Sequence, residues 1–216
     1  MPNNPVHRSP VSAKHSFDDR SGRYRNNKTG KFVPQKTIAR ALDYQIKKSA
    51  ASMQSVTRNL MDKKIGVAEW RGQMVKHIKT IHIAQYAAGQ GGWGRMTQAD
   101  YGRIGGILKK QYSYLNGFAN DLQANPPDGR ALVRAGLYAS AANATYAASQ
   151  KMERHEAGMS KERRVLDNGA ENCTDCIEWA ERGWVPIFSS PPIGSSKCKV
   201  NCRCTMEFSD EDDPPD

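Results

Sequence analysis

The chain has 216 residues, of which 38% are hydrophobic, and its 32 Lys and Arg outnumber its 22 Asp and Glu, which gives a formal charge of +10. This length is sufficient for one hydrophobic core and not obviously for two. No apolar run approaches the roughly 18 residues of a membrane-spanning helix, and the N-terminus lacks the apolar stretch of a signal peptide. We therefore expect a soluble protein with no membrane partner.

The first 36 residues are basic and show no hydrophobic periodicity. They carry eight Lys or Arg and two Asp, so their net charge is +6 (8 − 2). Their Pro, Asn and Ser content predicts a flexible or extended arm, with a turn or short hairpin in the Gly-punctuated stretch 20–33. A solvated arm would explain the charge, and so would contact with nucleic-acid phosphates or with a partner protein. The candidate contact residues are Arg20, Arg23, Arg25, Lys28 and Lys31.

Two helices are predicted after this arm. Apolar residues recur at intervals of three and four from residue 37 to about 63, and again from 67 to about 88. Gly66 separates the two runs, and so short a joint favours antiparallel neighbours. The glycine-rich stretch 89–94 that follows has no Lys-Ser/Thr after it and no strand before it, so we interpret it as a loop and not as a phosphate-binding motif.

A third helix begins at Thr97, where Asp100 completes a predicted capping box. Pro126 and Pro127 end it. Glycine inside a helix costs up to about 1 kcal/mol relative to alanine, and close approach of a neighbouring backbone would compensate for that cost. We expect such an approach at the four glycines of this helix, Gly102, Gly105, Gly106 and Gly117.

A fourth helix is predicted from Asp128, its N-cap, to Gly158, its C-terminal signal. The fold class that follows is mainly α: a helical bundle or a pair of helical hairpins, closed by a small irregular Cys-rich α+β module. We expect four parts in the chain. They are a basic flexible N-terminal arm (1–36), a helical domain (37–158), a Cys-rich module (159–208) and an acidic tail (209–216).

All five cysteines lie between residues 173 and 204. Cys173 and Cys176 form C-x-x-C, and Cys198, Cys202 and Cys204 form C-x-x-x-C-R-C. Two such half-sites, joined by a turn-rich loop, can supply four thiolates to one structural zinc ion. Our first choice of ligands is Cys173, Cys176, Cys202 and Cys204, with Cys198 as the alternate. The zinc ion would replace the hydrophobic core that so small a segment lacks.

Three other interpretations of the cysteines stay open. They could be free structural thiols without a metal. A disulfide framework requires an oxidising compartment, and an odd number of cysteines would leave one unpaired. A thioredoxin-like redox pair at Cys173 and Cys176 requires a preceding strand in a βαβ unit, and no such unit is predicted.

The C-terminal region resembles the signature of the phage head morphogenesis family, the minor head proteins similar to protein F of phage Mu. The residues that carry this resemblance are RRVLDNGAENCTDCIEWA, then Gly183 and Trp184, then PPIGSS and finally CKVNCRCTMEF. They cover about a quarter of the chain and match in both order and spacing. Many members of the family carry a histidine shortly before the N-C-R-C, where this chain has Cys198 and Lys199.

The resemblance implies a virion structural protein, a minor head or head-morphogenesis protein at the portal or the inner face of the capsid. Its role would lie in capsid assembly, genome packaging or ejection. Its location would be the virion and, during assembly, the host cytoplasm. The implied partners are portal or capsid proteins, and the basic arm could also touch packaged DNA.

Two other functions are alternatives to a virion structural protein. A zinc-ribbon-like nucleic-acid-binding protein would use bases around the cysteines as its patch, namely Arg163, Arg164, Lys197, Lys199 and Arg203. An enzyme would need a recognisable catalytic set, and the sequence contains no Ser/His/Asp arrangement and no paired carboxylates at a telling spacing. We therefore predict a non-enzymatic protein, with no catalytic residues and no small-molecule substrate.

Overall fold

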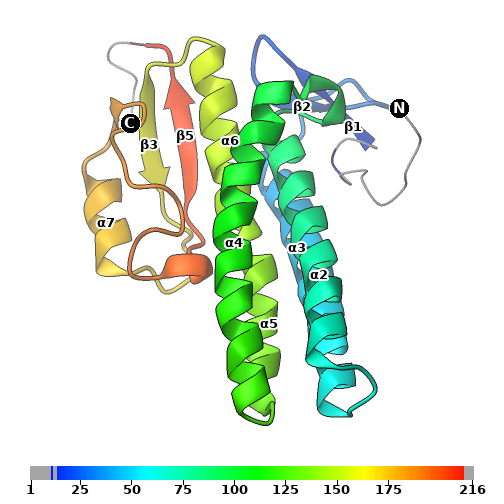
Figure 1. The fold of residues 1–216 in the computed structure, drawn as a ribbon. Helices are drawn as coiled ribbons and strands as arrows, with labels where there is room; N and C mark the ends of the chain where they lie inside the picture. Colours follow the sequence, from blue (N-terminus) through cyan, green and yellow to red (C-terminus); the bar gives the residue numbers. More distant parts are fainter. Residues whose placement is uncertain (1–10, 12–13, 212–216) are drawn as a thin grey trace.

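The computed structural model describes Val11 and residues 14–211, and its fold class is the predicted one: mainly α, with a small α+β module at the C-terminus (Figure 1). The helices are α2 (Gln35–Met61), α3 (Val67–Gly89), α4 (Gln98–Ala124), α5 (Gly129–Ser140), α6 (Ala142–Glu156) and α7 (Thr174–Glu181), with short 3-10 turns η2 (Trp93–Arg95) and η3 (Lys199–Asn201). The strands are β1 (His15–Asp18), β2 (Arg23–Asn26), β3 (Lys161–Val165), β4 (Val185–Pro186) and β5 (Thr205–Ser209).

The long helices pack around one main core. Helix α3 is central, because it contacts α2, α4 and α6, while α2 also lies along α5. The core is built from the apolar stripes that the sequence predicted, and its largest fully buried side chain is Trp70. The Trp70 ring meets Phe118 edge to face at 5.0 Å, and its Nε1 donates a hydrogen bond to Thr57 Oγ1 at 3.0 Å. Among the described residues, no helix is both long and apolar enough to cross a lipid bilayer.

The helix starts follow from capping chemistry. Thr97 and Asp100 form the predicted capping box, in which each side chain accepts from the other residue's backbone N–H. Asp128 caps α5 by accepting from the backbone N–H of Arg130. Helix α2 begins at Gln35 with Pro34 as its N-cap residue, three residues before the predicted Thr37 cap.

The predicted fourth helix is two helices in the structure. The chain breaks at Ala141, between α5 and α6. The physical reason is a change of packing partner, because α5 lies against α2 whereas α6 lies against α3.

The expected close backbone approach at the glycines of α4 is wrong. A Cβ atom built on Gly102, Gly105, Gly106 or Gly117 would meet nothing within 4 Å. All four lie on the exposed side of α4, away from the core residues of the same helix. Their cost in helix propensity is therefore not compensated by packing within the described part of the chain.

The described part of the N-terminal segment is a hairpin rather than an extended arm. Strands β1 and β2 pair in antiparallel fashion, and Phe32 forms a bridge to Arg25. The hairpin is held on the helices because Tyr24 is buried and its hydroxyl donates to the carbonyl of Ala88 at 2.5 Å. The rest of the predicted arm, residues 1–10, 12 and 13, and the end of the acidic tail, 212–216, lie outside the described residues.

The C-terminal module is a three-stranded antiparallel sheet in the order β4-β3-β5, with α7 packed beside it. Strand β5 lies next to α6, which attaches the module to the helical body (Figure 1). The N-terminal hairpin lies on the other side of the long helices in the same view. The module thus forms one flank of the molecule, and it carries all five cysteines.

Candidate metal centre

Each cysteine is positioned at the end of a local element. Cys173 is the N-cap residue of α7, and Cys176 lies in the first turn of that helix. Cys198 and Cys202 flank the 3-10 turn η3, and Cys204 directly precedes β5. The loop from 187 to 197 returns the chain from β4 to the start of α7, where the backbone N–H of Lys197 donates to Asp175. The C-x-x-C pair and the C-x-x-x-C-R-C group therefore meet.

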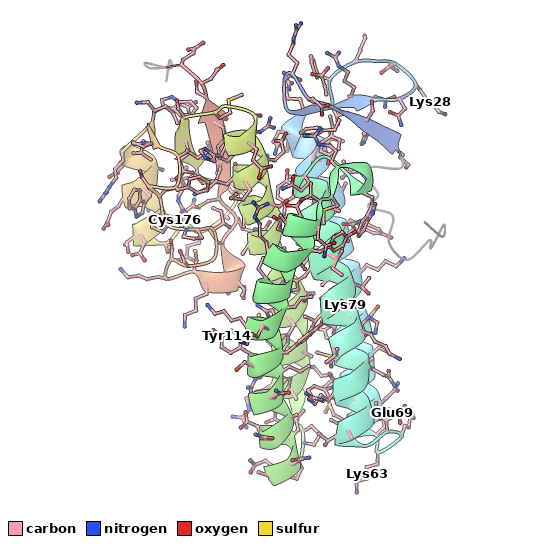
Figure 2. The ribbon with its side chains drawn as sticks, turned by 45° about the horizontal axis from the view of Figure 1, so that its top comes forward. Lys28, Lys63, Glu69, Lys79, Tyr114 and Cys176 are labelled. Atoms are coloured by element: carbon pink, nitrogen blue, oxygen red, sulfur yellow. The ribbon has the colours of Figure 1, made fainter. Side chains whose placement is uncertain are left out.

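The five sulfur atoms converge around Cys176, which Figure 2 labels within the module. They form two groups of three, Cys173–Cys176–Cys198 and Cys176–Cys202–Cys204, and within each group all sulfurs lie within 4.8 Å of one another. Cys176 Sγ is 3.7 Å from Cys198 Sγ and 3.8 Å from Cys202 Sγ. A tetrahedral zinc ion with Zn–S bonds of about 2.3 Å places its sulfurs about 3.8 Å apart. The cluster is therefore geometrically compatible with a metal ion.

Burial divides the cysteines into two kinds. Cys176, Cys202 and Cys204 are buried, with 1%, 3% and 4% of their surface exposed. Cys173 and Cys198 are half-buried, at the outer side of the cluster. The buried three form one of the two groups, and each half-buried thiol is grouped with Cys176 instead. Among the described residues no four cysteine sulfurs, the first-choice set Cys173, Cys176, Cys202 and Cys204 included, all lie within 4.8 Å of one another.

The thiols perturb one another strongly. The hydrogen bond from Cys204 lowers the pKa of Cys202 from 9.0 to about 4, and the same hydrogen bond raises the pKa of Cys204. Two neighbouring thiols cannot easily both be charged, so one keeps its proton and donates it to the other. The hydrogen bond therefore favours the thiolate form of Cys202, and a thiolate is the form that binds soft metal ions.

The disulfide and the thioredoxin-like redox alternatives find less support in the geometry. All five cysteines are free thiols, with no disulfide among them. The C-x-x-C does begin a helix, α7, as in redox proteins. However, every strand pair in the described residues is antiparallel, so the C-x-x-C does not belong to a βαβ unit of that kind.

Arg164 was a candidate for a nucleic-acid patch, and the structure places it inside the cluster instead. It is 3% exposed, with Nη1 at 3.5 Å from Cys176 Sγ and 4.0 Å from Cys202 Sγ. The other members of that candidate patch lie at the surface, where most are neutralised. Arg163 pairs with Glu207, Lys197 with Asp175, and Arg203 with Asp43. Among the described residues only Lys199 of this set has neither an ion pair nor a buried position.

The five basic residues predicted as N-terminal contacts all belong to the hairpin or its flanks. Arg25 is partly engaged, since it pairs with Asp18 at 2.7 Å and its guanidinium lies 3.8 Å from the Phe32 ring centroid. Arg23 also stacks on Phe32, at 4.5 Å. Arg20, Lys28 and Lys31 are exposed, and Figure 2 labels Lys28 at the far end of the hairpin. These residues share one small region, separate from the cysteine cluster.

Sequence reasoning missed a buried ionic contact that supports the module. Glu162 is fully buried, and its carboxylate lies 2.7 Å from Lys151 Nζ of α6. It also accepts hydrogen bonds from the backbone N–H and the hydroxyl of Ser190, at 2.9 and 2.5 Å. The sequence signal that could have predicted this contact is the alternation of side chains along the strand KERRV, which places residues 162 and 164 on the same face.

No family model, curated protein or solved structure matches the chain. The resemblance to phage head morphogenesis proteins therefore depends on the C-terminal residues quoted above.

Proposed function

We propose that the chain is a virion structural protein, a minor head or head-morphogenesis protein of a phage. The observation that carries this proposal is the C-terminal signature itself, whose five cysteines converge on Cys176. A motif whose widely spaced residues meet at one point acts as a unit of structure. The proposal assigns it a role in capsid assembly, genome packaging or ejection, with portal or capsid proteins as partners.

The cluster would hold one structural zinc ion. Zinc prefers four thiolates in a tetrahedral arrangement, and a closed set of protein ligands leaves no open position for a substrate. The buried cluster of the module consists of three cysteines with Ile193 and Met206. The module therefore has few apolar residues to form a core. Metal binding would supply the missing folding free energy. A structural ion of this kind agrees with a protein that has no enzymatic activity.

The zinc proposal is tested by elemental mass spectrometry on the purified chain, before and after chelation. About one zinc per chain is expected. Cys176 belongs to both sulfur groups, so Cys176→Ser should abolish zinc binding. Cys173→Ser and Cys198→Ser should each retain zinc, on the proposal that either of these half-buried neighbours of Cys176 supplies the fourth ligand. No zinc in the unmodified chain, or full zinc in the Cys176 variant, would exclude this site.

The virion role is tested separately, by mass spectrometry of particles purified from the source phage. The chain should be present in mature heads, and particles made without it should be defective in assembly or DNA content. Its absence from both heads and assembly intermediates would contradict the proposal. This result would not test the zinc site, which the metal analysis decides separately.

The basic hairpin is the proposed contact for DNA or for an acidic capsid surface. Phosphate contacts through Lys and Arg are sensitive to salt, so duplex DNA binding by the full chain should weaken steeply between 50 and 200 mM salt. Replacing Lys28 and Lys31 with Glu, which reverses their charge, should reduce that binding. A zinc-ribbon-like protein would instead lose binding in Lys199→Glu, and the pairing of Arg163, Lys197 and Arg203 with carboxylates disfavours it.

A further inference from the structure

Strand β3 directs two charged side chains toward the protein interior. Its sequence is KERRV, and the alternation of the strand buries Glu162 and Arg164 while their neighbours face outward. A buried charge is costly unless an opposite charge and hydrogen bonds accompany it. Each of the two inward side chains must therefore have a compensating group.

Glu162 has an ordinary partner. Lys151 of α6 lies 2.7 Å from one carboxylate oxygen, and Ser190 donates two hydrogen bonds to the other. This inward charge is thus neutralised by a cation from the helical body.

Arg164 has no such carboxylate. Within the described residues, its guanidinium forms no ion pair with Asp or Glu. One nitrogen, Nη2, donates to the carbonyl of Pro191 at 2.5 Å, and the other, Nη1, faces Cys176 Sγ and Cys202 Sγ. Arginine does not lose its proton in proteins, so its charge is present whatever surrounds it. The neighbours that can become anionic are the cysteine sulfurs.

We propose that Arg164 is the fixed counter-charge of the thiolate metal centre, an inference that rests on the zinc site proposed above. A zinc ion with four thiolates carries a net charge of −2, and the guanidinium would reduce the charge of this buried assembly to −1. Arg164 would donate N–H bonds to the sulfurs of Cys176 and Cys202 in the loaded site. It is a positioning residue and not a ligand, because a guanidinium has no free lone pair to offer a metal.

The same side chain would couple the metal to the loop that carries Cys198. Nη2 holds Pro191, and Ile193 of this loop is buried in the cysteine cluster. The chain then runs through Gly194, which has a positive φ of 86°, toward Cys198. Replacing Arg164 with an uncharged residue would therefore remove the positive charge beside the sulfurs. It would also remove the hydrogen bond that holds this loop at Pro191.

The test is the zinc affinity of the full-length chain, measured by competition with a chromophoric chelator. Mutation of a residue that hydrogen-bonds to a metal ligand typically lowers metal affinity by about 10- to 100-fold. We expect Arg164→Met to weaken zinc binding by that factor. The matched control is Arg163→Met. It removes the same type of side chain one position earlier, on the opposite face of β3, where Arg163 pairs with Glu207 at 2.8 Å and lies over the Trp184 ring. The control should bind zinc with unchanged affinity.

A spectroscopic readout separates charge compensation from simple support. Cobalt(II) bound to thiolates shows sulfur-to-metal charge-transfer absorption, and hydrogen bonds to sulfur raise its energy. Arg164→Met should move this band to longer wavelength, whereas Arg163→Met should not. If Arg164→Met fails to fold, Arg164→Gln decides, because glutamine removes the charge but keeps an amide N–H donor. Arg164→Gln should weaken zinc binding, whereas Arg163→Gln should not.

The outcomes are distinguishable. If the unmodified chain binds neither zinc nor cobalt, the zinc site and this inference fall together. If it binds both, and Arg164→Met matches Arg163→Met in affinity and band position, only the inference is overturned. Unchanged affinity and spectrum in Arg164→Gln, where that variant decides, would overturn it as well.

Discussion

At the scale of single residues, His82 shows how burial controls a charge in this protein. The side chain is completely buried between α3 and α6, and its Nδ1 lies 2.7 Å from Thr145 Oγ1. Burial lowers the pKa of His82 from 6.5 to about 4, because the charged imidazolium would lose its hydration. The native protein therefore holds this histidine neutral well below the pH at which an exposed histidine becomes charged.

This pKa predicts a pH-dependent stability. Between pH 6.5 and about 4 the unfolded chain takes up a proton at His82 and the native chain does not. The contribution of neutral His82 is thus complete above pH 6.5 and is lost as the pH falls toward 4, by about 3 kcal/mol in total. Urea unfolding at pH 7 and pH 4.5 would measure the change. His82→Gln is the control, since thiol and carboxylate protonation affect both proteins alike. Equal pH slopes for the two would contradict the prediction.

The residue scale also shows what sequence could and could not predict about the site. The cysteines were predictable because thiols at these spacings have few other uses. Arg164 and Glu162 were not, since a run such as KERRV is usually a solvated face. Which of its residues face inward depends on β3 pairing with β5, residues more than forty positions away. Charge alone also misassigned Arg164 to the surface.

At the scale of whole elements, the helices were predictable from apolar periodicity, and their packing partners were not. The break at Ala141 lies in a stretch of high helix propensity, so no local signal marks it. It appears only when α5 and α6 find different neighbours. The glycines illustrate the same limit, because identical residues meet different surroundings in α3 and α4.

The glycines support a matched pair of substitutions. Gly106 of α4 has open space around it, so Gly106→Ala should stabilise the chain by up to about 1 kcal/mol through helix propensity and a less flexible unfolded state. Gly89 of α3 is different, because a Cβ there would lie 2.6 Å from Ser149 Cβ and 2.7 Å from the Tyr146 carbonyl. Gly89→Ala should destabilise the chain by about 1–3 kcal/mol through overpacking. Thermal unfolding of both variants measures the difference. Destabilisation by Gly106→Ala would contradict the open environment of that residue.

At the scale of the whole molecule, the protein consists of a helical body with its own core and a C-terminal module that depends on its attachments. The polar contacts that join them include Lys151 with Glu162, Asn143 Nδ2 donating to the carbonyl of Cys202 at 3.2 Å, and Arg203 with Asp43. The core around Trp70 includes no residue of the module. The module's own buried cluster is small and consists largely of cysteines. Stability should therefore be divided unequally between the two parts.

This division predicts the effect of metal removal. Chelation should unfold the module and leave the helical body folded, because only the module lacks an adequate apolar core. Hydrogen exchange followed by mass spectrometry would locate the change. Peptides covering α7 and β5 should lose protection, whereas peptides covering α3 and α4 should keep it. Cys176→Ser should reproduce the chelated pattern without chelator, and Arg163→Met should behave like the unmodified chain. Parallel loss of protection in α3 would show instead that the body and the module fold as one cooperative unit, in which the buried Lys151–Glu162 pair transmits the effect of the metal.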